Sequence, residues 1–130
     1  MEINLRLIEA SETDTEASIL NVLELTNDAD PREASLEGVD RVDLQFPKFS
    51  DGRAYSQAFV LRRRLGFTGE IRATGDVLVD QLVQMQRTGF SSAVLRADQD
   101  LGDARRQFER YARFYQGDAV SVLPLFREFA

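Results

Sequence analysis

Residues 46–81 read FPKFSDGRAYSQAFVLRRRLGFTGEIRATGDVLVDQ, and this stretch decides the fold. It contains two polar loops, each of which leaves an expected strand and leads into an expected helix. Further strands flank it, VDLQF at 42–46 and SAVLR at 92–96. Three consecutive strand–helix units with short connections predict a mainly parallel sheet, because parallel strands must be joined by a crossover.

The helices of these units have recognisable ends. Polar side chains that can accept from free helix amides precede each helix, and a glycine follows it. The expected caps are, in chain order, Ser50 or Asp51, then Asp76, then Asp98 or Asp100. The expected terminating glycines are Gly66, Gly89 and Gly117.

The N-terminal part is less regular. Residues 3–8 and 19–25 both have strand patterns, and the two could pair as a hairpin, although their connection is long. Asp30 followed by Pro31 favours the start of a short helix that ends by Gly38.

Together these elements predict one α/β domain over residues 1–130. Its sheet is mainly parallel, has four to five strands, and carries helices after the central strands. An open three-layer sheet and a half-barrel both fit the chain length, whereas a closed eight-stranded barrel needs about 200 residues or more. A hydrophobic content of 43% and a charged content of 29% are ordinary for a globular protein.

Cysteine and histidine are absent from the chain. Their absence excludes thiol catalysis, thiolate-ligated iron–sulfur clusters and a Ser-His-Asp triad, and it removes the usual zinc ligands. Proton transfer would rest on Asp, Glu, Tyr, Arg, the single lysine Lys48, or a bound cofactor. No dinucleotide or phosphate-loop motif occurs. The cofactor stays unknown, and the sequence leaves open whether the chain is an enzyme.

Charge and hydropathy limit the partners. A net charge of −6 argues against nucleic acid. No apolar run approaches the ~20 residues of a membrane span. The N-terminus MEINLRLIEASE lacks the basic and apolar regions of a signal peptide, so the expected compartment is the cytoplasm. The basic triplet at 62–64 is expected on the solvated face of a helix.

The first loop is a candidate ligand site. In a parallel α/β domain, ligands bind at the carboxyl ends of the strands. Helix N-terminal amides beside cationic side chains would favour a small anion there. Plain turn and cap chemistry is the competing interpretation, since Ser-Asp-Gly is a common turn. The candidate residues of this loop are Lys48, Asp51, Arg53, Tyr55 and Ser56.

The second loop contributes Arg72, Asp76 and Asp80. Asp80 lies four residues beyond Asp76, so in the expected helix the two carboxylates share a face. They could bind a divalent cation or share a proton, but two carboxylates are not specific, and we assign no metal site. Arg72 lies inside a strand and needs an acidic partner, for which Asp51 or Asp76 is expected. A structural ion pair and a substrate clamp both stay open.

A third polar run, NDADP at 27–31, follows the strand pattern at 19–25. Asn27 and Asp28 could join the same rim of the sheet, although turn and cap chemistry also explains them.

Two runs resemble a known bacterial family of unknown function, whose label describes an oxidoreductase involved in sulfite reduction. LTNDADP at 25–31 precedes the specific match at 46–81, and the resemblance covers about residues 21–117. The family signature has a Phe-Pro-x-Phe-x-Asp-Gly-Arg loop before Tyr-Ser, and an Arg-Ala-x-Gly-Asp-Val-Leu loop before Asp-Gln. The matching positions are Phe46, Pro47, Phe49, Asp51, Gly52, Arg53, Tyr55, Ser56, Arg72, Gly75, Asp76, Asp80 and Gln81.

The genes of that family often lie beside the gene for assimilatory sulfite reductase, so the resemblance implies a role in reductive sulfate assimilation. No catalytic residue carries over. One hypothesis is a non-catalytic accessory partner of sulfite reductase. The alternative is an oxidoreductase or sensor that binds a small oxyanion: sulfite, sulfate or a nucleotide phosphosulfate. The sequence also leaves open whether the chain forms a homodimer.

Overall fold

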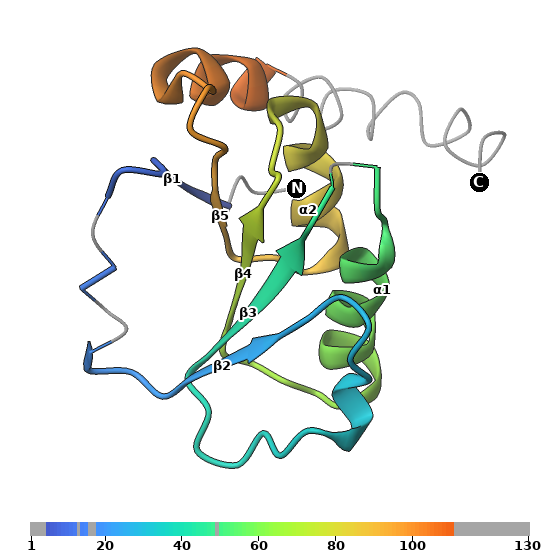
Figure 1. The fold of residues 1–130 in the computed structure, drawn as a ribbon. Coiled ribbons are helices and arrows are strands. Elements are labelled where there is room, and N and C mark those ends of the chain that lie inside the picture. Colours follow the sequence, from blue (N-terminus) through green and yellow to red (C-terminus); the bar gives the residue numbers. More distant parts are fainter. Residues whose placement is uncertain (1–4, 13, 16–17, 49, 111–130) are drawn as a thin grey trace, which may run out of the picture.

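The computed structural model describes residues 5–12, 14–15, 18–48 and 50–110, which form a five-stranded sheet with helices (Figure 1). The strand order is β1-β5-β4-β3-β2, and every neighbouring pair is parallel. The predicted parallel α/β fold is therefore confirmed. The strands are β1 (Arg6–Ile8), β2 (Val22–Leu25), β3 (Arg41–Phe46), β4 (Glu70–Gly75) and β5 (Ser92–Val94).

Helical segments connect the central strands. Between β3 and β4 lie α1 (Arg53–Phe59) and the π-helical turn η3 (Val60–Arg64). Between β4 and β5 lie the 3-10 turn η4 (Val79–Gln81) and α2 (Leu82–Thr88). A 3-10 turn, η2 (Pro31–Glu33), lies between β2 and β3.

Several predicted helix ends are observed. Asp30 accepts from the Arg32 amide at the start of η2, and Gly89 ends α2 with a φ of +113°. Residues 101–110 are helical, and Asp100 accepts from the Asp103 amide at 2.7 Å. The predicted end at Gly117 lies outside the described residues.

The apolar core lies between the sheet and its crossover helices, which cover the same face (Figure 1). Alternate strand residues point into it, because successive side chains of a strand face opposite ways. Fully buried core side chains include Val42, Leu44, Phe46, Ala54, Ala58, Leu61, Ile71, Ala73, Leu82, Met85 and Ala93.

The predicted hairpin between the first two strands is wrong. β1 pairs with β5 and β2 with β3, so the two lie at opposite edges of the sheet. The ends of β1 and β2 are therefore separated by four strand spacings of about 4.8 Å across the sheet. Residues 9–21, if extended, reach up to ~43 Å, which is ample for this separation.

Candidate functional site

The two polar loops meet at the carboxyl rim of the sheet, as predicted. Phe46 and Gly75, which end β3 and β4, are register partners. The Asp76 amide donates to the Phe46 carbonyl at 2.7 Å. Gly75 has a φ of +95°, and a Cβ built there would lie 2.5 Å from that carbonyl oxygen. Only glycine allows the two strand ends to approach so closely.

In the first loop, Arg53 is bound by Asp51. Its Nη2 donates to Asp51 Oδ2 at 2.8 Å and its Nε to Oδ1 at 3.1 Å. These hydrogen bonds from Arg53 lower the pKa of Asp51 to about 2. Asn27 also donates to Asp51, so the third polar run does join this rim. The Arg53 side chain remains 62% exposed.

In the second loop, Asp76 binds an arginine from beyond β5. Arg96 donates to Asp76 at 2.8 Å and to Asp98 at 2.6 and 2.7 Å. The prediction that Asp76 caps a helix is wrong. The next helical turn is η4, whose N-cap is Leu78, and Gln81 accepts from the Leu78 amide there.

The predicted sharing of one helix face by Asp76 and Asp80 is therefore also wrong. Asp76 precedes the helical residues, whereas Asp80 lies exposed within η4. The i,i+4 geometry that would align their carboxylates requires a continuous helix between them. In the described part of the chain, no group of three or more Asp or Glu side chains lies together as a metal ion would require.

Tyr55 lies between the two loops. Its ring packs edge-on against Phe46 and Phe90, with centroids 5.1 and 6.3 Å apart. Burial, reinforced by the negative charge of Asp80, raises the pKa of the Tyr55 phenol to about 12. Lys48, just after β3, and Ser56, within α1, are both exposed.

The basic triplet in η3 is only partly solvated, contrary to expectation. Arg62 donates to the carbonyls of Gly89, Phe67 and Gly69 at 2.9, 2.9 and 2.7 Å. It also donates to the Ser91 hydroxyl at 2.8 Å. Arg62 is therefore a structural clamp, whereas its two neighbours are exposed.

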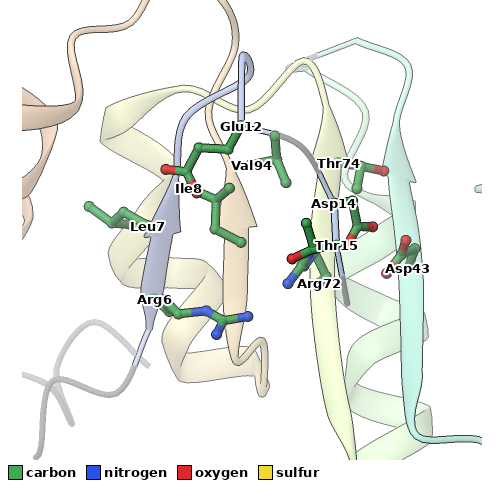
Figure 2. Close-up of a pocket in the computed structure, with 10 residues that line it drawn as sticks. All are labelled: Arg6, Leu7, Ile8, Glu12, Asp14, Thr15, Asp43, Arg72, Thr74 and Val94. Atoms are coloured by element: carbon green, nitrogen blue, oxygen red, sulfur yellow. The ribbon is translucent and has the colours of Figure 1, made fainter. Parts of the chain in front are cut away.

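Arg72 is not at the rim. It lies in the middle of β4, opposite Asp43 in the register, and its side chain is on the face away from α1 and α2 (Figure 2). Its Nη2 donates to Glu70 at 2.9 Å and its Nη1 lies 3.5 Å from Asp14. The expected partners, Asp51 and Asp76, bind other arginines instead. The reason is strand alternation, which directs residue 72 away from the helix face of the sheet.

Arg72 belongs to a group of charged and polar residues that we term the polar face: Asp14, Arg41, Asp43, Glu70, Arg72 and Ser92. Arg41 binds Asp43 at 2.8 Å and Asp14 at 2.6 Å. The Ser92 hydroxyl donates to Glu70 at 2.8 Å and accepts from Arg72 at 3.1 Å. Burial raises the pKa of Asp43, an effect opposed by the hydrogen bond from Arg41.

A cavity of about 280 Å³ lies on this side of the sheet (Figure 2). Its walls combine charges of both signs with hydroxyl and apolar groups. The residues that line it are Arg6, Leu7, Ile8, Glu12, Asp14, Thr15, Asp43, Arg72, Thr74 and Val94.

Among the residues of the polar face and of the cavity, the sequence interpretation identified only Arg72 as a candidate site residue. A signal was available in RVDLQF and EIRATG, where charged and apolar residues alternate in two adjacent central strands. Parallel sheets are usually covered on both faces, so charges repeated there need buried partners.

The family described as bacterial protein of unknown function, DUF934, matches residues 22–126, and the chain belongs to it. No curated protein and no solved structure matches the chain. None of the helices in the described residues has the length and apolar content of a membrane span.

Proposed function

We propose that this chain is an accessory protein of assimilatory sulfite reduction and acts as a non-catalytic partner of sulfite reductase. The sulfur pathway rests on the sequence resemblance over residues 46–81. The partner role rests on two exposed apolar side chains, one at the end of α1 and one just beyond η3.

These side chains are Phe59 and Leu65, which are 46% and 38% exposed. The Arg63 guanidinium lies over the Phe59 ring at 5.9 Å. A hollow of about 420 Å³ adjoins Leu65, and its lining combines apolar residues such as Leu36 with polar ones such as Asp40 and Thr68. Large apolar side chains beside exposed arginines are typical of protein interfaces. The exposure of Phe59 and Leu65 is the observation that carries the proposal.

The ion pairs at the rim also favour a partner role over an oxyanion-binding site. Arg53 already binds Asp51, and Arg96 already binds Asp76 and Asp98. Arg72 faces the other side of the sheet, so it does not converge with Arg53 on one ligand. An incoming anion would have to compete with carboxylates held in place by the fold.

The test is affinity capture of the tagged chain from the cytosol of its native bacterium, with mass spectrometry of sulfite reductase subunits. The wild-type chain should enrich them. Phe59→Ser combined with Leu65→Ser should reduce enrichment about tenfold, since both side chains are exposed and the fold should persist. Ile19→Ser is the matched control, because Ile19 is 80% exposed in a different segment. Absence of the subunits from the wild-type capture would refute the proposal.

A genetic test addresses the pathway separately. Deletion of the gene should slow growth on sulfate and leave growth on cysteine unchanged. Equal growth on both sulfur sources, with unchanged sulfite reductase activity in extracts, would count against any sulfur role.

The alternative function is a small-oxyanion-binding oxidoreductase or sensor, favoured by the exposed Lys48 and Arg53 at the rim. Calorimetry with sulfite, sulfate and a nucleotide phosphosulfate distinguishes it. Heat of binding that Arg53→Ala weakens about tenfold would support this alternative.

A further inference from the structure

The two outer strands of the sheet differ at their free edges (Figure 1). β1 and β2 each pair with one neighbour, so the other edge of each strand carries backbone groups that the sheet does not use. Near the free edge of β1, the Leu5 amide donates to Gln86 Oε1 of α2 at 3.1 Å. A side chain from the helix layer therefore covers part of that edge.

The free edge of β2 has no such cover among the described residues. The Asn21 carbonyl accepts from the Arg41 amide at 3.2 Å, which directs Asn21 toward β3. Bonded residues alternate along a parallel strand. Leu23 therefore also bonds toward β3, whereas the amides and carbonyls of Val22 and Glu24 point outward. Within the described part of the chain, no hydrogen bond reaches these outward groups, which form a template for another strand.

The side chains of β2 also suit an added strand. Leu25 is buried in the core, but Leu23 packs against the core and is only partly buried. A strand placed beside β2 would remove more of the Leu23 side chain from water, which is favourable. Glu24 is the single charge of this strand and lies on the opposite face. One exposed charge, without proline, is a weak defence against edge pairing.

An antiparallel copy of β2 fits this edge in one register. When Leu23 lies opposite its counterpart, Val22 and Glu24 of each copy form hydrogen-bonded pairs with Glu24 and Val22 of the other. All the outward amides and carbonyls of β2 are then satisfied. Each Glu24 faces a valine, whereas a register centred on Glu24 would place like charges directly opposite, which is destabilising. The edge is therefore self-complementary, as a two-fold interface requires.

We propose that two copies of the chain associate through their β2 edges, antiparallel, with Leu23 at the two-fold axis. The two five-stranded sheets then form one continuous sheet with both helix layers on the same side. This interface uses neither Phe59 nor Leu65, so it can fail independently of the proposed partner role.

A cysteine placed at the axis tests the register. The chain has no cysteine, so a single introduced thiol can form a disulfide only with another copy. Facing Cα atoms in a non-hydrogen-bonded antiparallel pair lie about 4.5 Å apart, which a disulfide can span. Under mild oxidation, Leu23→Cys should form the linked dimer at least about tenfold faster than Ile19→Cys. Ile19 is 80% exposed and more accessible, but it lies four residues from the axis, far from its counterpart.

Sedimentation velocity measures association without a disulfide. With increasing concentration, the wild-type chain should shift from 14.7 kDa to twice that mass. Glu24→Pro removes an outward amide that the single chain does not use, at an edge position where proline is tolerated. It should weaken association at least about tenfold. Glu24→Gln keeps the amide and is the matched control, which should associate at least as well as the wild type.

Circular dichroism checks the fold of each variant, and the comparison of Leu23→Cys with Ile19→Cys decides the question if Glu24→Pro misfolds. A wild-type chain that stays monomeric at every concentration would overturn the proposal. Equal rates of linkage for the two cysteine variants would also overturn it. A dimer that is equally strong in Glu24→Pro and Glu24→Gln would show that the copies meet at another surface.

Discussion

Asp43 and Arg72 lie opposite each other on β3 and β4, and both side chains are buried on the face away from α1 and α2. The Arg72 charge helps to lower the pKa of Asp43, which burial raises. Removing two such charges from water is unfavourable unless each has partners of opposite sign. Arg41, Glu70 and Asp14 supply those partners. Each charge therefore depends on the others.

Loss of Arg72 should be strongly destabilising. Arg72→Met leaves Glu70 and Asp14 without one of their cations and should lower the free energy of unfolding by about 3–5 kcal/mol. Urea denaturation followed by circular dichroism measures this. Arg53→Met is the control, since that ion pair is largely exposed and should leave the midpoint nearly unchanged. Equal midpoints for the two variants would contradict a buried network.

The rim depends on Gly75. Gly75→Ala places a Cβ 2.5 Å from the Phe46 carbonyl oxygen in a backbone of φ +95°, so both a clash and strain oppose it. Gly38→Ala has a similar φ of +75° but no atom within 4 Å of its Cβ. We expect about 1–2 kcal/mol of destabilisation at Gly38, from backbone strain alone, and at least ~2 kcal/mol more at Gly75. Chemical denaturation of both variants separates strain from clash, and equal losses would mean that the rim relaxes.

Arg62 should contribute more to stability than Arg64. Arg62→Ala removes the donor to three carbonyls and the Ser91 hydroxyl, and should cost about 2–4 kcal/mol. Arg64 is exposed, so Arg64→Ala should change the free energy of unfolding by at most ~0.5 kcal/mol. Thermal melts of the two proteins test the difference. A comparable loss for both would show that the clamp is not important for stability.

The environment of Tyr55 predicts an alkaline transition. Its pKa is raised to about 12 in the folded chain, whereas an unfolded tyrosine titrates near ~10. The unfolded chain therefore loses this proton first as pH rises, and the contribution of Tyr55 to stability declines from about pH 10 to about pH 12. Tyr55→Phe should remove that part of the decline.

Asp80 provides the matched variant for this titration. Asp80→Asn should lower the pKa of Tyr55, because it removes a nearby negative charge, while burial keeps the pKa above its ordinary value. Difference absorbance between each protein and its Tyr55→Phe counterpart isolates this phenol from the other tyrosines. An unchanged titration in Asp80→Asn would assign the whole shift to burial.

The sequence predicted the central fold well because its signals are local. Strand periodicity around Val42, Ile71 and Ala93, with helix patterns between, requires parallel pairing through crossovers. The meeting of the two loops at Phe46 and Gly75 follows directly from adjacent parallel strands. Helix starts were less accurate. Asp76 was expected to cap a helix, but Arg96, which is distant in sequence, binds its carboxylate.

By itself, the sequence determined that strands β3, β4 and β5 are parallel and that their polar loops share a rim, since periodicity and connection length are properties of neighbouring residues. Only the tertiary structure decided that β1 lies beside β5, at the edge of the sheet opposite β2, because strand pairing at that separation depends on packing. It also decided the environment of Arg72. A charged residue at alternate strand positions can face either water or buried partners. Here Asp14, which is distant in sequence, lies against Arg41 and Arg72, so these charges have buried partners.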